Sequence, residues 1–261
     1  MLDKLVLSNI LIITKYTFRE VLKSKVLVST LLIGLGLLGA VFVAYSFTYG
    51  EPSRVALDFG LGTLSLSSIA IAIFMGVGIV ANEIESRTVY LIISRPIPRF
   101  AFLIGKLNGL ALLLVLNILI LSLMTLSLYF VIGGNYQPLI SWSIVFITLE
   151  SIMMLVLVTF LSLVSSKVFA VIFSIALYVV GHAIDGVKSL TMVKESPFLK
   201  GIISIYHYIL PAFYKLNLKE YVLYNQNMEL SYLLSTFAYG VIYTSALVLL
   251  SIFIFERKNL D

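Results

Sequence analysis

Cysteine is absent from this 261-residue chain, and charged residues are few. Without cysteine, disulfides and thiolate metal sites are excluded, and the redox compartment of the protein stays undetermined. Charged residues make up only 12% of the sequence, about half the share of a soluble domain, while 60% is hydrophobic. A chain this apolar cannot cover itself with polar surface in water. The composition therefore predicts an integral membrane protein, whose solvent is a lipid bilayer.

The excess of basic over acidic residues, 18 against 13, does not gather in one segment. The basic residues are scattered among loops that flank apolar runs, which is typical of membrane topology. We therefore expect no nucleic-acid partner. We also expect no secretory signal peptide, because charged residues interrupt the first 25 positions and no small-residue cleavage pattern follows a short apolar core.

Six apolar runs are long enough to cross a bilayer, which takes roughly 20 residues in a helix. They are residues 26–48, 59–81, 104–132, 139–165, 168–187 and 233–255. The sequence therefore predicts an all-α integral membrane fold with six transmembrane helices in a single domain, residues 1–261. Only Ser165, Ser166 and Lys167 separate the fourth run from the fifth, so these two helices are expected to be antiparallel neighbours.

Lysine and arginine mark the predicted cytoplasmic side of the membrane. Residues 1–25 carry five of them and residues 82–106 carry four, whereas the loops 49–58 and 133–138 together carry one. Both termini and the segment 82–106 are therefore expected in the cytoplasm. The segment 188–232, with five lysines on the predicted outer side, departs from the rule, although long loops count for less in it.

A basic stripe lies in the N-terminal segment. Lys15, Arg19 and Lys23 recur at every fourth residue and would share one face of a helix. This pattern predicts that residues 1–25 form an interfacial helix along the inner headgroups, on the cytoplasmic side. The alternative is a cytoplasmic extension of the first span, because the apolar residues of the segment do not form one clean face.

The segment 188–232 is too aromatic and apolar for a flexible tail. Residues 198–210 are too few to span the membrane but suit a helix at the outer leaflet, and residues 214–224 predict a second short amphipathic helix. We expect these short helices, which lie between the fifth and sixth spans, to cap the outer end of the bundle.

The second predicted span is rich in small residues, which let helices approach one another closely. Such a face would form a subunit interface or the wall of a conduit, or it would pack within the bundle. The small residues of this span are Gly60, Gly62, Ser65, Ser67, Ser68, Gly76 and Gly78.

The segment that joins the second and third spans, residues 82–99, is charged and contains two prolines near its end. Glu83 to Ser94 are expected to form a short amphipathic helix with acidic residues at its start, where they favour the helix dipole. Pro96 and Pro98 end this helix and favour an extended exit. A stiff, charged helix on the cytoplasmic side predicts a docking element for a partner protein. The alternative is an ordinary basic loop that only enforces topology.

Three groups of residues, in order and on the expected sides, resemble ABC-2-type permeases, the membrane subunits of many bacterial ABC transporters. The first group is Thr17-Phe18-Arg19-Glu20 with Ser24-Lys25, before the first span. The second is Glu83, Glu85, Arg87-Thr88, Leu91, Ser94-Arg95-Pro96-Ile97-Pro98-Arg99 and Gly105-Lys106. The third is Ile209-Leu210-Pro211 with Leu216-Asn217, before the last span. The resemblance covers the whole topology, although many relatives have glycine where this chain has Arg87.

This resemblance implies a permease subunit in a prokaryotic plasma membrane, where it dimerises and binds a separate ABC ATPase that holds ATP and magnesium. Residues 82–99 would be the coupling helix that fits a cleft of the ATPase. The implied coupling residues are Glu83, Glu85, Arg87, Thr88, Ser94, Arg95, Pro96 and Arg99. Export is expected because the family mostly exports, and the subgroup closest in appearance includes the permeases of copper-enzyme maturation systems.

Catalytic motifs are missing from the sequence. Gly105-Lys106 is followed by leucine and position 100 is phenylalanine, so the phosphate-binding loop of ATPases is absent. A His-Glu-x-x-His zinc motif is absent too, and His182 with Asp185 gives too few ligands for a metal. We therefore expect that the chain is not an enzyme, holds no cofactor or metal, and relies on a partner for ATP hydrolysis.

Glu150 lies near the middle of the fourth span, where an ionised carboxylate is costly and by default indicates a function. It would contact substrate in the pathway, relay a proton or pair across helices. The alternative is a protonated side chain that hydrogen-bonds to Thr148, Ser151 or a neighbouring helix. A second function to weigh is an ion-coupled secondary transporter centred on Glu150. Against it, the chain shows no internal repeat and no matching pair of helices broken by glycine or proline.

Overall fold

The computed structural model describes residues 2–23, 26–47, 50–85, 97–189, 201 and 210–258. Nearly all of these residues are helical, and no β-strand occurs among them, so the predicted all-α class is confirmed. The long helices are α1 (Leu2–Leu22), α2 (Val26–Phe47), α3 (Pro52–Glu85), α5 (Arg99–Val131), α6 (Pro138–Val164), α7 (Lys167–Ser189) and α11 (Leu230–Arg257). The short ones are the 3-10 helix η1 (Phe213–Leu216) and α10 (Lys219–Leu223).

Five helices are long and apolar enough to cross a membrane, so the chain is a multi-pass membrane protein. The five spans are Pro52–Gly78, Arg99–Val131, Pro138–Val164, Lys167–Val187 and Leu230–Arg257, and they contain or overlap the last five predicted runs. The first predicted run, 26–48, forms α2. The apolar stretch within α2, Val28–Ala44, is shorter than the five spans and is not one of them. The first of the six predicted spans therefore stays a prediction.

The helix α3 is much longer than the run predicted for it, and α5 is slightly longer. They contain 34 and 33 residues, and at 1.5 Å per residue each measures about 50 Å, against about 30 Å for the hydrocarbon core. Residues 82–85, predicted to open a separate short helix, instead continue α3, because nothing in Asn82-Glu83-Ile84-Glu85 breaks a helix. Both helices therefore extend beyond the hydrocarbon layer.

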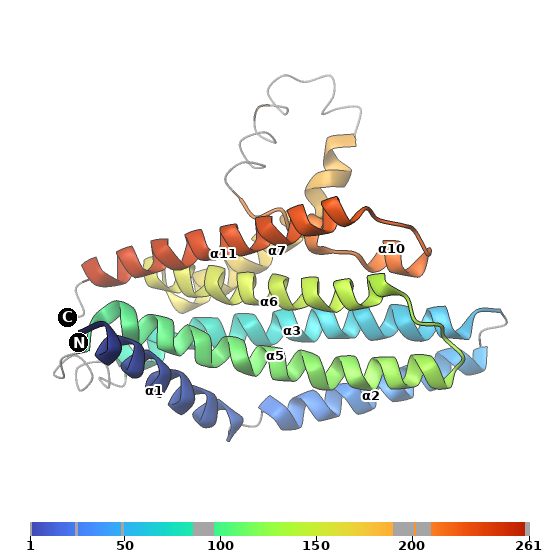
Figure 1. Cartoon of the computed structure of the whole chain (residues 1–261), viewed down its shortest axis with the longest axis horizontal. Helices are drawn as coiled ribbons and strands as arrows, with labels where there is room; N and C mark the ends of the chain where they lie inside the picture. Colours follow the sequence, from blue (N-terminus) through green and yellow to red (C-terminus); the bar gives the residue numbers. More distant parts are fainter. Residues whose placement is uncertain are drawn as a thin grey trace.

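The long helices form a bundle in which α6 packs against α3, α5, α7 and α11 (Figure 1). At one end of the bundle α1 begins, α3 ends, α5 begins and α11 ends; we call it the termini end (Figure 1). At the other end lie the α5–α6 loop and α10; we call it the cap end (Figure 1). The start of α1, the end of α11 and the start of α5 thus lie together, as the charge pattern predicts. The side of the membrane that each end of the bundle faces stays a prediction.

Glycines of α3 lie where neighbouring helices come closest. A Cβ atom added at Gly60 would meet Cγ2 of Thr125 on α5, and one added at Gly76 would lie 2.9 Å from the main-chain oxygen of Leu155 on α6. Neither position tolerates a larger side chain without moving a helix. Packing within the bundle, one of the interpretations of the small residues, is therefore confirmed for these two glycines.

The helices α1 and α2 follow α5 in succession. Near the termini end, Ile13 of α1 faces Gly105, and towards the cap end Thr30 of α2 accepts a hydrogen bond from Nδ2 of Asn117. Gly34 lies still further along, where an added Cβ would meet the side chain of Met124. Both helices therefore run in the same direction as α5, and in Figure 1 α1 crosses it obliquely.

The segment before α11 closes the cap end. We call residues 210–229 the cap segment; the predicted single helix over 214–224 is divided there into η1 and α10, since Asn217 and Leu218 interrupt it. Phe213 and Leu216 are fully buried, and Lys219 forms a 2.6 Å ion pair with Asp58 of α3. Packing against the bundle is thus observed for this segment, while most of the predicted helix 198–210 lies outside the described residues.

Candidate functional site

The structure describes three of the residues expected to couple to an ATPase, and all three lie at the termini end. Glu83 and Glu85 are in the last turn of α3, and Arg99 is the first residue of α5. Pro98 directly before α5 is extended, with φ −65° and ψ 142°, as predicted for the proline exit. The other candidates lie outside the described residues: Arg87, Thr88, Ser94, Arg95 and Pro96.

Arg99 fastens the start of α5 to the end of α11. Its Nη1 donates hydrogen bonds to the main-chain oxygens of Glu256 and Lys258, at 3.2 and 3.1 Å. The Lys258 ammonium donates in turn to the main-chain oxygen of Leu163 in the last turn of α6, at 2.8 Å. The last carbonyls of a helix lack partners within it, and cations satisfy them while complementing the helix dipole. We call these contacts of Arg99 and Lys258 the termini-end clamp.

The helix α1 adds a second, tighter contact to the start of α5. A Cβ atom at Gly105 would lie 2.8 Å from Cβ of Ile13, and one at Gly109 would lie 2.7 Å from Cβ of Thr17. The Thr14 hydroxyl donates a hydrogen bond to the main-chain oxygen of Gly105, at 3.2 Å. The two glycines, four residues apart, therefore allow the α1 and α5 backbones to touch.

The basic stripe lies on the side of α1 that faces away from α5. Lys15 and Arg19 are exposed, as is Lys23 directly after the helix. Leu7 and Leu11, each 62% exposed, lie on the same side. A surface that mixes basic and apolar side chains suits the boundary between headgroups and acyl chains. The predicted helix is thus present, and its place at the inner headgroups stays a prediction.

Glu150 is buried between α6 and α7, with its side chain only 2% exposed. Neither of the hydroxyl partners considered from the sequence bonds to it, since Thr148 and Ser151 donate to the carbonyl oxygens of Ile144 and Ile147 on their own helix. Its neighbour is instead His182 of α7, whose Nε2 lies 3.2 Å from Glu150 Oε1. Pairing across helices is therefore what the structure shows.

This partner was detectable in the sequence but was missed there. Glu150 lies 15 residues before Ser165, and His182 lies 16 residues after Ser166. Since only a tight turn separates α6 from α7, residues equally far from the turn meet on the two antiparallel helices. From the sequence alone, His182 is considered only together with Asp185, as a pair with too few ligands for a metal, and is not connected with Glu150.

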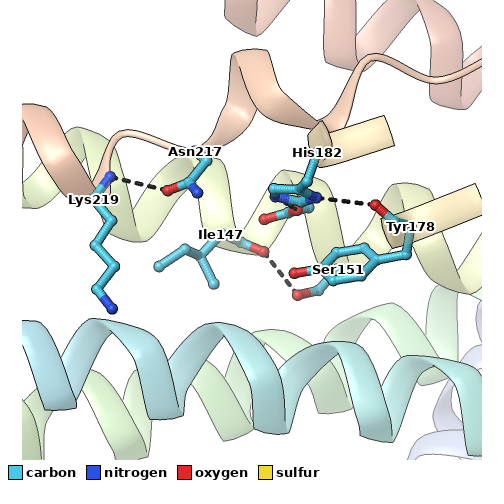
Figure 2. Close-up of polar contacts among 7 residues, drawn as sticks. Ile147, Ser151, Tyr178, His182, Asn217 and Lys219 are labelled. Atoms are coloured by element: carbon cyan, nitrogen blue, oxygen red, sulfur yellow. Dashed lines mark hydrogen bonds and ion pairs between the residues drawn. The ribbon is translucent and has the colours of Figure 1, made fainter. Parts of the chain in front are cut away.

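Aromatic rings surround the histidine. The Tyr178 ring centroid lies 4.5 Å from that of His182, and the Phe213 ring stacks on His182 at 6.0 Å with an angle of 6° between the planes. The His182 Nδ1 contacts the main-chain oxygen of Tyr178 at 3.2 Å (Figure 2). The hydroxyl of Tyr178 hydrogen-bonds to the side chain of Ser65 on α3. The pair thus connects α6 and α7 with the cap segment. The contact of Phe213 with His182 is not predicted by any local pattern in the sequence.

Two pockets open at the cap end. The larger, of about 500 Å³, lies between the start of α6 and the cap segment, and its lining includes Gln137, Trp142 and Asn225. The other, of about 290 Å³, lies between the start of α3 and the α5–α6 loop, beside Arg54 and Tyr129. Glu150 lines neither of them. The buried pair is therefore separate from these two openings.

No protein-family model matches this chain, and no curated protein matches it significantly.

Proposed function

We propose that this chain is the permease subunit of an ABC exporter in a prokaryotic plasma membrane. Two copies would assemble with a separate ABC ATPase that binds ATP and magnesium. α2 would be the first of six spans, and the termini end, with both termini, would face the cytoplasm. Residues 82–99 would then dock on the ATPase. The residue pattern that resembles ABC-2-type permeases supports this proposal, together with the arrangement of the termini end.

The termini-end clamp is the observation that carries the proposal. Arg99 is the last residue of the proposed docking segment and the first of α5, and it holds the backbone at the end of α11. Lys258 extends the same connection to α6. A force applied to residues 82–99 by an ATPase would therefore be transmitted to three long helices together. A loop that only enforced topology would need positive charge but not these specific bonds to main-chain oxygens.

The packing of α6 supports a pathway between two copies. Its side chains Met153, Met154 and Val158 are fully buried in contact with the surrounding helices, which leaves little room along the bundle axis. α7 and α11, by contrast, carry large exposed apolar residues, among them Phe173 at 53% and Phe253 at 52%. In the proposed dimer one part of this surface faces lipid and another faces the second copy.

The surface of α1 fits the same arrangement. With the termini end in the cytoplasm, Lys15, Arg19 and Lys23 would reach the anionic headgroups of the inner leaflet. Leu7 and Leu11 would enter the acyl region beside them. α1 would then anchor the start of α5 at the membrane surface while residues 82–99 engage the ATPase.

The proposal expects an ABC ATPase to be encoded in a reading frame beside this chain, and the test is binding of that ATPase. The two are co-expressed, extracted in detergent and purified through a tag on the permease, and the amount of ATPase retained is measured. Glu83→Ala with Thr88→Ala is expected to reduce retention at least tenfold. The control Lys219→Met changes a charge at the cap end and should retain the ATPase fully. Equal retention by both variants would refute the docking assignment.

Arg99→Ala separates docking from force transmission. Because the Arg99 guanidinium bonds to main-chain oxygens of this same chain, this variant should still retain the ATPase. Its ATP-driven transport should fall, however, while ATP hydrolysis continues. Loss of binding in Arg99→Ala would place Arg99 in the docking surface itself.

The second candidate, ion-coupled transport centred on Glu150, is favoured by one observation, the contact with His182 at 3.2 Å. The purified chain alone, reconstituted in liposomes with a proton gradient and no ATPase, distinguishes the two. Uptake or efflux that needs only the gradient, and that Glu150→Gln abolishes, would support the second candidate.

A further inference from the structure

The environment of Glu150 does not compensate a negative charge. Its side chain is 98% buried, and no aligned hydrogen-bond donor reaches Oε1. The nearest polar group is His182 Nε2 at 3.2 Å. An ionised carboxylate held in such a place is strongly unfavourable unless a second group neutralises it.

The contacts of the histidine ring assign one of its protons. A main-chain oxygen can only accept, so the contact of Nδ1 with the Tyr178 oxygen assigns a proton to Nδ1. Nε2 then faces Glu150 Oε1, and one further proton shared between these two atoms is enough. The proton lies either on the carboxyl group or on Nε2 of the ring. Both forms hold the same number of protons, and both leave the pair neutral overall.

We infer that Glu150 and His182 form a buried proton-binding site, and that the bound proton keeps α7 and the cap segment seated on α6. When the proton leaves, a carboxylate is left beside the lone pair of Nε2, and both atoms gain by reaching water. His182, whose side chain is 23% exposed, is the part of the pair nearest to solvent. Movement of Phe213 or α7 away from the ring would expose the pair further, so deprotonation is expected to shift the population towards an open cap.

Other ionisable groups lie on the elements around the pair. They are Tyr178 and Asp185 on α7, Tyr214 and Lys215 on η1, Asp58 on α3, and Tyr239 and Tyr243 on α11. Asp58 is paired with Lys219, and the Lys215 ammonium lies over the Tyr239 ring at 4.9 Å. Burial, with a smaller effect of the nearby Asp185 carboxylate, raises the pKa of Tyr214, so this phenol stays neutral across the range tested below. The tests must therefore assign any effect to Glu150 by substitution.

This site does not depend on the proposed function. A proton that seats the cap segment would act in a permease driven by an ATPase and equally in a protein with another role. The tests use the purified chain without an ATPase, so their outcome and that of the binding test above are independent.

The first test counts the protons on the pair. The chain has two histidines, His182 and His207, so His207→Asn leaves one ring to observe by nitrogen NMR after histidine labelling. Infrared spectroscopy of the same protein reports a protonated carboxyl, assigned by its loss in Glu150→Gln. At neutral pH we expect a protonated Glu150 with a neutral ring, or an ionised Glu150 with a doubly protonated ring. An ionised Glu150 beside a neutral ring at neutral pH would overturn the inference.

The second test follows the cap segment through single cysteines, which the cysteine-free chain allows. Ala212→Cys places a thiol at a position that is 2% exposed, and Tyr224→Cys places one at a position that is 64% exposed. The ratio of their labelling rates by a charged maleimide cancels the ordinary effect of pH on a thiol. This ratio should rise several-fold from acidic to alkaline pH.

Glu150→Gln should keep that ratio constant, because glutamine cannot ionise, and Glu150→Leu serves as a second variant with the same expectation. Circular dichroism and size-exclusion profiles verify that both remain folded. Two results would show that the pair does not control the cap segment. The labelling ratio would stay constant with pH in the protein that retains Glu150, or it would rise equally in that protein and in Glu150→Gln.

Discussion

The two ends of the bundle are held together in different ways. At the termini end, Gly105 and Gly109 bring the backbones of α1 and α5 into contact, and Arg99 and Lys258 bind main-chain oxygens. At the cap end, side chains meet side chains, through the partly exposed Lys219 pair and stacked rings, beside two open pockets. Backbone contacts are difficult to rearrange, whereas side-chain contacts can break and re-form. We therefore expect the termini end to resist rearrangement more than the cap end does.

The largest effect is expected where α1 and α5 touch. Gly109→Val puts methyl groups against the main-chain oxygen of Thr14, 2.9 Å from the added Cβ, and should cost about 3 kcal/mol of unfolding free energy. Thermal unfolding in detergent measures it. The control is Gly36→Ala on α2, where nothing lies within 4 Å of an added Cβ, and it should be neutral or slightly stabilising. Equal melting temperatures for the two variants would contradict the close packing at the termini end.

A double-mutant cycle tests the pair that joins α6 to α7. Glu150→Leu or His182→Leu alone leaves a buried polar group without its partner and should each cost about 2 kcal/mol. The double variant should recover part of that loss, because neither group then remains. Denaturant unfolding of the four proteins gives the coupling. Losses that simply add would show that the two side chains do not interact.

The termini-end clamp should give an intermediate effect. Arg99→Ala removes two hydrogen bonds from a cation to carbonyl oxygens, of which one is exposed, and should cost about 1 kcal/mol. Hydrogen exchange should become faster mainly in the last turn of α11. Arg54→Ala at the cap end removes an exposed pair with Glu51 and provides the comparison. Exchange that changes equally at both ends would contradict the clamp.

The smallest effect is expected from the ion pair of the cap segment. Lys219 and Asp58 are 32% and 44% exposed, so solvent screens them and Lys219→Met should change stability by less than about 1 kcal/mol. The same variant should still increase labelling of Ala212→Cys slightly, since it loosens α10. A loss of stability as large as that of Gly109→Val would show that the cap end is held as firmly as the termini end.

The spans were predictable because apolar runs of about 20 residues have few alternatives in a chain this poor in charge. The extra turns of α3 were not, since polar and charged turns carry no apolar signal; hydropathy alone does not locate the ends of this helix at Pro52 and Glu85. The division of the helix predicted over 214–224 at Asn217 was also missed.

The candidate site was predictable only in part. The importance of Glu150 followed from its depth in a span, and His182 could have been added from the tight turn. The stacking of Phe213 on His182 could not, because it is a contact between segments about 30 residues apart with no periodic relation. The role of Arg99 was predicted as a contact with a partner, and its bonds to the end of α11 became visible only in three dimensions.

The lengths of α3 and α5 have a mechanical consequence. A helix is stiff over this distance, and each of these two reaches past both faces of a layer only about 30 Å thick. When such a rod pivots inside the bilayer, a displacement applied at one protruding end reappears at the opposite end with its direction reversed. Such a displacement would cross the bilayer as a rotation of the whole helix, without any change of structure within the hydrocarbon layer.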